Sequence, residues 1–140
     1  MAHWLLKSEP SSYSWDRLVA DGRTHWDGVR NPQALNSLRA MKLGDRAFFY
    51  HSNEGKDIVG IVRVSKTYAP DPTDKTGTFG AVEVEAARAL KSPVPLAVIK
   101  EHAQLKNMAF VKQSRLSVSP VTAAEWKGVC ALGETGARGA

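Results

Sequence analysis

Cysteine, long hydrophobic runs and clustered charges are all scarce in this chain of 140 residues. The single cysteine, Cys130, excludes an internal disulfide and a cysteine-based metal cluster, and is typical of a reducing cytoplasm. No apolar stretch is long enough to cross a membrane, and the first residues lead into a short strand without the basic region of a signal peptide. We therefore expect a soluble cytoplasmic protein that binds no membrane.

The charge balance is basic, with 19 Lys and Arg against 14 Asp and Glu and a formal net charge of +5. This excess permits binding to nucleic-acid phosphates but does not establish it, because many basic domains bind none. The basic residues are dispersed, so a positive surface has to be assembled by folding. The length predicts one domain that buries about two-thirds of its unfolded surface without a disulfide or a metal.

The most informative stretch runs from Trp26 to Asn31 and places an indole, a carboxylate, a guanidinium and an amide close together. Asn31 is a strong N-cap and Pro32 suits a first helical position, so a helix is predicted to begin at Pro32. The free N–H groups at its start suit an anionic or carbonyl-bearing ligand. The alternative is structural: Trp26 is a core aromatic, Arg30 pairs with Asp27, and Asn31 is only a cap.

Two predicted apolar strands, over residues 4–7 and 46–51, end in side chains that can donate and accept hydrogen bonds. These side chains are Lys7, Ser8 and Glu9 after the first strand, and Tyr50, His51 and Ser52 after the second. Lys7 and Glu9 share one face of an extended backbone and could bind the polar edge of a ligand, or form a surface ion pair with each other. His51 alone is more often a satisfied structural histidine, but its polar neighbours favour a pocket.

The remaining patterns predict short helices and strands within one mixed domain. Helices are expected from Ser14 to Gly22 with Trp15, Leu18 and Val19 on one face, from Pro95, and after a capping box of Thr122 and Glu125, and Gly44 is expected to cap a helix. Strands are expected over residues 58–68, 82–87 and 116–119. Polar loops are expected over residues 70–80 and around Pro93 and Pro95. Residues 108–111 fit a turn or a short strand.

A polar patch at residues 112–115 precedes the strand expected at residue 116. Lys112 and Arg115 could contact phosphates, while Gln113 and Ser114 could bind the polar edge of a base. The alternative is a solvated loop.

Four short motifs, taken together and in order, resemble the EVE domain family. They are WLLKSEP at residues 4–10, WDGVRN at 26–31, GD at 44–45 with FFYHS at 48–52, and QSRLSV at 113–118. The resemblance implies an α+β, PUA-like fold: a small mixed β-barrel with flanking short helices over residues 1–132. Residues 133–140 hold no large apolar side chain and are expected to form a disordered tail.

The family resemblance also implies a pocket that takes a flipped, modified nucleobase, with 5-methylcytosine or 5-hydroxymethylcytosine as the suggested ligand. The residues carried over to that pocket are Trp26, Lys7, Ser8, Glu9, Arg30, Asn31, Tyr50, His51, Ser52 and Arg115, and phosphate contacts are assigned to Lys112 and Arg115. No catalytic residue, metal or cofactor is expected. The expected partner is DNA or RNA that carries a modified base.

Several alternatives stay open at this point. The chain could be an amidohydrolase acting on acylated cytidine, as in some ASCH-type domains, with Lys7 and Glu9 as activator and general acid or base. It could instead read an RNA modification, or bind a protein partner without any base pocket. The long basic N-terminal extension of the nuclear relatives is missing, which favours a bacterial-type, stand-alone, monomeric domain in the cytoplasm.

Overall fold

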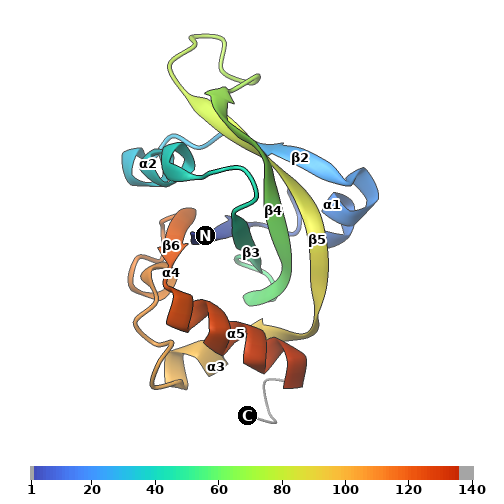
Figure 1. The fold of residues 1–140 in the computed structure, drawn as a ribbon, viewed down its shortest axis with the longest axis vertical. Coiled ribbons are helices and arrows are strands. Elements are labelled where there is room, and N and C mark those ends of the chain that lie inside the picture. Colours follow the sequence, from blue (N-terminus) through green and yellow to red (C-terminus); the bar gives the residue numbers. More distant parts are fainter. Residues whose placement is uncertain (1, 136–140) are drawn as a thin grey trace.

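Within residues 2–135, the fold is a mixed six-stranded sheet with five short helices packed around it (Figure 1). The computed structural model describes residues 2–135. The strands are β1 (His3–Ser8), β2 (Arg23–Trp26), β3 (Arg46–His51), β4 (Asp57–Pro70), β5 (Gly80–Pro95) and β6 (Val118–Val121). The helices are α1 (Trp15–Asp21), α2 (Pro32–Ala40), α3 (Leu96–Glu101), α4 (Ala109–Lys112) and α5 (Ala123–Thr135).

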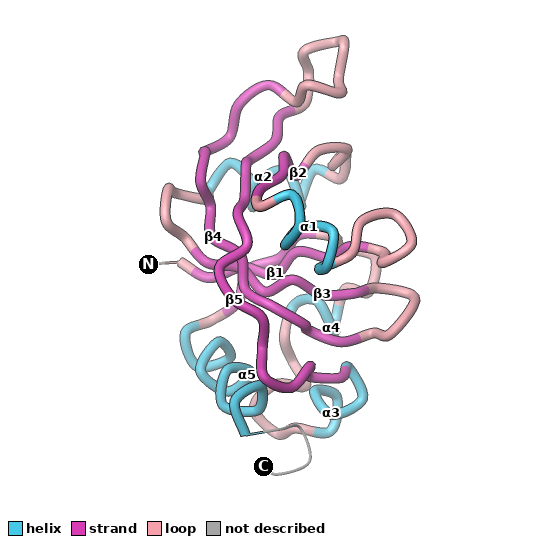
Figure 2. Tube along the Cα trace, turned by 90° about the vertical axis from the view of Figure 1, so that its right-hand side faces the viewer, coloured by secondary structure: helices cyan, strands magenta, loops and turns pink. Residues whose placement is uncertain are grey.

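The sheet has the strand order β2-β5-β4-β3-β1-β6. β1 runs parallel to β3, and every other neighbouring pair is antiparallel. The β4–β5 pairing shifts register at several points, and such irregularities increase strand twist and bending. Figure 2 shows the two strands as one long curved ribbon. The α+β class is confirmed, but within residues 2–135 the outer strands β2 and β6 do not pair, so the sheet is open and bent rather than a closed barrel.

The sheet separates two apolar clusters. Because side chains alternate along a strand, Leu6 and Phe49 enter the cluster beneath α1 and α2, whereas Leu5 and Phe48 enter the cluster beneath α3, α4 and α5. All four side chains are fully buried. This two-sided burial explains why the central strands β1 and β3 are apolar runs rather than alternating sequences.

The predicted N-terminal caps of α2 and α5 are confirmed. The Asn31 side-chain oxygen accepts the backbone N–H groups of Gln33 at 2.8 Å and Ala34 at 3.1 Å, and Pro32 is the first residue of α2. Thr122 and Glu125 form the reciprocal capping box of α5, at 2.9 and 3.2 Å. Such caps are local, which makes them readable from sequence.

Several predicted features are wrong where tertiary pairing overrides local signals. β5 continues through Pro93 to Pro95 because it pairs with the start of β4, where a loop was expected. Residues 109–112 form helix α4 instead of a turn or strand. β6 begins at Val118, two residues later than expected. Val19 on α1 is 54% exposed and does not face the core.

Two end positions also differ from expectation. Gly44 has a positive φ of 86°, but it lies in the turn before β3, since α2 already ends at Ala40. Helix α5 continues to Thr135, past Gly133 where the disordered tail was expected to begin. Glu134 in that last turn pairs with Arg88 at 2.8 Å and Lys91 at 3.5 Å, which ties the helix end to β5. Residues 136–140 of the expected tail lie outside the described residues.

The packing of Trp15 on β4 gives a test of the fold. A Cβ atom at Gly60 would lie 2.5 Å from the Trp15 ring. That ring is held edge-on against Phe49, so we expect Gly60→Ala to lower the free energy of unfolding by about 1–3 kcal/mol in urea denaturation followed by circular dichroism.

A double-mutant cycle supplies the control for this clash. Trp15→Phe removes the ring atoms that a Cβ at Gly60 would meet, so Gly60→Ala should cost much less in that background. Equal costs in both backgrounds would contradict the clash.

Candidate functional site

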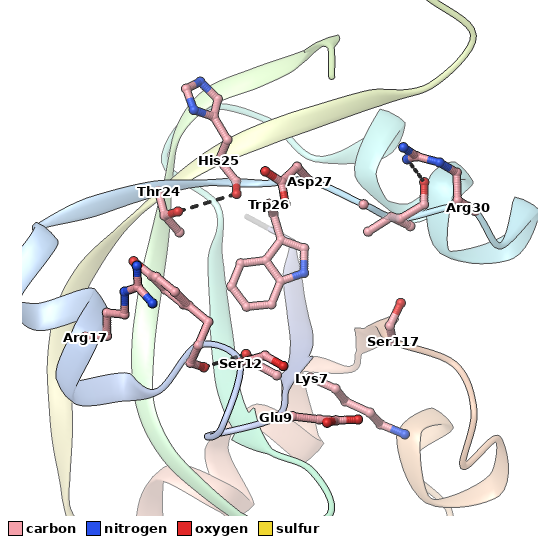
Figure 3. Close-up of a pocket in the computed structure, with 14 residues that line it drawn as sticks. Lys7, Glu9, Ser12, Arg17, Thr24, His25, Trp26, Asp27, Arg30 and Ser117 are labelled. Carbon is pink, nitrogen blue, oxygen red and sulfur yellow. Dashed lines mark hydrogen bonds between the residues drawn. The ribbon is translucent and has the colours of Figure 1, made fainter. Parts of the chain in front are cut away.

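One cavity formed by residues 2–135 has a volume of about 560 Å³ and is larger than a second cavity of about 280 Å³. It is bounded by the end of β1, the turn before α1, the strand β2 and the loop that leads to α2 (Figure 3). The sequence-predicted residues that line it are Lys7, Ser8, Glu9, Trp26 and Arg30. Polar strand ends and the stretch from Trp26 to Arg30 are therefore brought together in space, although they are separate in sequence.

Trp26 ends β2 and forms a wall of this cavity. Its ring meets Phe49 edge-on with centres 5.7 Å apart, and only 6% of the residue is exposed. The indole is therefore both a core aromatic and a cavity wall. Its N–H group finds no acceptor among residues 2–135 and is not enclosed, so this donor is available to a ligand. Figure 3 shows the indole above Lys7 and Glu9.

The polar side chains at the end of β1 already hold neighbouring segments in place. The Lys7 ammonium donates to the carbonyls of Phe110 at 3.2 Å and Ser114 at 2.9 Å, and burial lowers the pKa of Lys7. The Ser8 hydroxyl donates to a backbone carbonyl at 2.6 Å. Glu9 accepts a hydrogen bond from the Asn53 amide at 2.7 Å. The alternative of a Lys7–Glu9 ion pair is wrong.

A buried carboxylate, Asp71, fixes the loop between β2 and α2. Asp71 lies between β4 and β5, and its Oδ2 accepts the Gly28 N–H at 3.0 Å and the Arg30 guanidinium at 3.2 Å. Gly28 has a φ of 73°, a backbone conformation that residues other than glycine rarely adopt. Arg30 also stacks on Phe79, 4.5 Å from the ring centre. The expected alternative pairing of Arg30 with Asp27 is therefore wrong.

Hydrogen bonds decide the ionisation of Asp71. Burial by itself would raise the pKa of its carboxyl group. The hydrogen bonds from the Thr73 hydroxyl and from the backbone N–H groups of Gly28 and Thr73, with the Arg30 guanidinium, outweigh burial and lower the pKa to about 2. The carboxylate is therefore charged at any physiological pH.

The other predicted site residues lie elsewhere. Tyr50 and Ser52 line a second, smaller cavity of about 280 Å³. His51 accepts the Trp15 backbone N–H at 3.1 Å through Nε2, so it serves the start of α1. The Asn31 oxygen is used by the α2 cap. Lys112, the last residue of α4, and Arg115, in the turn after it, are exposed and line neither cavity.

Comparison with known proteins places the chain in a family. Residues 2–132 match the EVE domain. This chain belongs to the EVE domain family. Thymocyte nuclear protein 1 of Gallus gallus is 40% identical over 94% of this chain and 69% of that protein. The structure of Rpa0253 from Rhodopseudomonas palustris is 54% identical with a TM-score of 0.91, and covers 95% of this chain and 93% of that one.

Another solved structure is described with a ligand. Human THYN1 in complex with DNA containing 5-methylcytosine is 37% identical, with a TM-score of 0.89, over 96% of this chain and 98% of that one. A YTH domain from Zygosaccharomyces rouxii shares the fold, at 15% identity and a TM-score of 0.61, over 95% of this chain and 86% of that one. The expected PUA-like fold of the EVE domain is thus confirmed.

Sequence reasoning missed part of the lining of the larger cavity in this EVE domain. The missed residues are Ser12, Tyr13, Arg17, Thr24, His25 and Ser117, while Asp27 was part of the predicted binding stretch but was not assigned to the pocket. Tyr13 and Arg17 are four residues apart at the start of α1, and the guanidinium lies 5.5 Å from the tyrosine ring centre. This spacing was the available signal, but nothing local indicates that α1 packs beside β2.

Other classes of site find no support within residues 2–135 of the EVE domain. No group of three His, Cys, Asp or Glu side chains is placed to hold a metal ion there. No helix in the same range has the length and apolar character needed to span a bilayer.

The lowered pKa of Asp71 predicts how stability depends on pH. Its folded pKa of about 2 lies below the ordinary 3.8, so its contribution is complete above about pH 5 and is lost as the pH falls from about 4 toward 2. We expect Asp71→Asn to lower the free energy of unfolding by roughly 1–2 kcal/mol at pH 7, and by much less at pH 2.5. Urea denaturation at both pH values measures this difference.

Asp16→Asn is the control for the loss of one carboxylate, because Asp16 is exposed on α1 and lines neither cavity. It should change stability little at either pH. A loss for Asp71→Asn that is the same at pH 7 and pH 2.5 would contradict the role of the ionised carboxylate.

Proposed function

We propose that this EVE domain is a non-enzymatic reader that binds nucleic acid and holds one flipped, modified cytosine in its larger cavity. The observation that carries the proposal is the convergence, around about 560 Å³, of an indole, carboxylates and cationic side chains. Ligand pockets for single small molecules typically span about 300–1,000 Å³. The relative described in complex with DNA containing 5-methylcytosine supports the choice of base.

The free polar groups of the cavity match the edge of cytosine. Cytosine presents an exocyclic amine, which donates hydrogen bonds to carboxylates, and a carbonyl, which accepts a hydrogen bond from a donor. Asp27 lines the cavity and makes no hydrogen bond or ion pair within residues 2–135, so its carboxylate can accept a hydrogen bond from the amine. The free indole N–H of Trp26 can donate to the carbonyl.

The energetics favour a reader with modest selectivity. Flipping a base out of its stack costs a few kcal/mol of free energy. Contacts between the base and the aromatic walls, and between cationic side chains and the phosphates, have to offset this cost. Trp26 and Tyr13 supply the aromatic walls, and Arg17 and Arg30 supply cations at the cavity. An added methyl group is distinguished by only about 1–3 kcal/mol, whereas a hydroxymethyl group that gains a hydrogen bond can be distinguished more sharply.

Hydrolysis of acylated cytidine receives no support from the geometry. It would use Lys7 and Glu9, but the ammonium of Lys7 is bound by the carbonyls of Phe110 and Ser114, and Glu9 is bound to Asn53. Whether the strand is DNA or RNA is decided by binding to matched oligonucleotides of both kinds. A cytoplasmic location and a monomeric state stay predictions.

Substitution of Trp26 tests the pocket. Trp26→Phe keeps an aromatic ring beside Phe49 but removes the indole N–H, and Trp26→Ala removes the wall entirely. In fluorescence anisotropy at fixed salt, we expect Trp26→Phe to weaken binding of oligonucleotides with 5-methylcytosine and with cytosine alike, because the carbonyl that loses its donor is common to both bases. We expect Trp26→Ala to bring the ratio of the two affinities close to one, because the wall beside the methyl group is lost.

Trp126→Phe is the matched control, because Trp126 stacks on Phe48 in the other apolar cluster and lines neither cavity. It should leave the ratio unchanged. Unchanged affinities in Trp26→Phe together with an unchanged ratio in Trp26→Ala, with the fold intact by circular dichroism, would remove Trp26 from the base site.

Asp27→Asn tests recognition of the cytosine amine. An amide at this position loses the charge that strengthens the hydrogen bond, so affinity for the 5-methylcytosine oligonucleotide should fall by about tenfold. The same removal of negative charge at Asp16, on α1, should leave affinity unchanged or raise it slightly. Equal effects of Asp16→Asn and Asp27→Asn would indicate a general charge effect and contradict the proposed hydrogen bond.

A further inference from the structure

A second cavity adjoins the larger one across the Lys7 side chain. It has a volume of about 280 Å³ and lies between the turn from β3 to β4 and the helices α3 and α4. Lys7, Lys56 and Lys100 line it, and no carboxylate does. The larger cavity differs, because Glu9 and Asp27 are part of its lining. The lining of the second cavity therefore favours a negatively charged ligand.

Neutral donors complete the second cavity. Tyr50 is buried, and its hydroxyl makes no hydrogen bond within residues 2–135. Burial, and then the negative charge of Asp57, raise the pKa of Tyr50 to about 12, so this hydroxyl keeps its proton at neutral pH. Ser52 supplies a second hydroxyl in the same lining. Lysines and protonated hydroxyls, without a carboxylate, suit a phosphate group.

The turn that carries Lys56 is held in a fixed shape. Asn53 and Lys56 both have positive φ, at 64° and 49°. The Ser52 N–H donates to the Ser8 carbonyl at 2.9 Å, and the Leu96 N–H donates to the Lys56 carbonyl at 2.8 Å. The turn is thus tied to β1 on one side and to the start of α3 on the other, which places Lys56 at the cavity before any ligand binds.

Lys7 connects the two cavities. It lines both, and its ammonium is fixed by the carbonyls of Phe110 and Ser114. Asn53 makes a second connection, since it lines the smaller cavity and donates to Glu9 of the larger one. A ligand that fills the larger cavity therefore has the smaller one directly beside it.

We propose that the second cavity binds a backbone phosphate of the strand, next to the nucleotide whose base occupies the larger cavity. This inference rests on the proposed function, because that base sets where the strand runs. Nucleosides and phosphates alternate along a strand. A base site with a lysine-lined cavity free of carboxylates beside it therefore matches the order of groups in the ligand. The phosphate interaction adds affinity and salt dependence but carries no base specificity.

The double variant Lys56→Ala with Lys100→Ala tests the proposal without touching the larger cavity. Its affinity for a single-stranded oligonucleotide with one 5-methylcytosine should fall by about tenfold, measured by fluorescence anisotropy over a NaCl series. The slope of log affinity against log salt should shrink by about 0.7 for each phosphate that the protein no longer neutralises. The ratio between modified and unmodified oligonucleotides should stay as in the wild type.

The matched control is Lys106→Ala with Lys127→Ala, which removes two exposed lysines that line neither cavity. It should leave affinity and slope close to the wild-type values. Tyr50→Phe, which keeps the ring against Phe110 and removes only the hydroxyl, should weaken binding severalfold. Equal losses of affinity in both lysine pairs, or no loss in the Lys56 and Lys100 variant, would overturn the proposal.

Free 5-methyl-2′-deoxycytidine 5′-monophosphate distinguishes the source of the phosphate. If the wild-type protein binds this mononucleotide as tightly as the oligonucleotide, the cavity takes the phosphate of a free nucleotide and the strand assignment is wrong. A wild-type protein that binds oligonucleotides without preference for 5-methylcytosine contradicts the proposed function instead. The two proposals therefore fail on different measurements.

Discussion

The larger cavity depends on one buried carboxylate from a distant part of the chain. Asp71 holds Gly28 and Arg30 from the turn at the end of the long β4–β5 ribbon. The loop between β2 and α2 has no regular structure of its own, and Gly28 adopts a conformation that needs such an anchor. The ribbon is long and bent, and this shape brings its turn over the start of α2. The bend of the sheet therefore determines the shape of the larger cavity, because it positions Asp71 against Gly28 and Arg30.

The parallel pairing of β1 and β3 is the second constraint, because it sets the two polar strand ends side by side. Lys7 pairs with Tyr50 and Ser8 pairs with His51. Side chains alternate across a sheet, so neighbouring residues at one strand end face opposite apolar clusters. Tyr50 therefore turns toward α3 and α4 and the smaller cavity, while Ser8 lines the larger one. Most residues that sequence reasoning placed in one pocket line two cavities that share Lys7, whereas His51, Asn31 and Arg115 line neither.

The parts of the fold that sequence could predict are those with local causes. The caps at Asn31 and Thr122 and the apolar runs of β1 and β3 are readable within a few residues. The site was predictable only where the same motif supplies several lining groups, as from Trp26 to Arg30. The contribution of Tyr13 depends on how α1 packs on β2, and Asp71 lies over forty residues from Gly28, so neither has a local signal. Asn31 was assigned to the pocket because its place in the sequence fits both a helix cap and a ligand contact. In the structure its side-chain oxygen caps α2.

The distribution of charge joins these observations into one argument about the ligand. A net charge of +5 dispersed along the chain says little by itself. In the folded chain the charges are distributed unevenly. Glu9 and Asp27 line the larger cavity together with cationic side chains, whereas the charged residues that line the smaller cavity are all lysines. A heterocycle with an amine and a carbonyl needs both acceptors and donors, and a phosphate needs only donors. The two linings thus correspond to the two chemically different parts of a nucleic-acid strand.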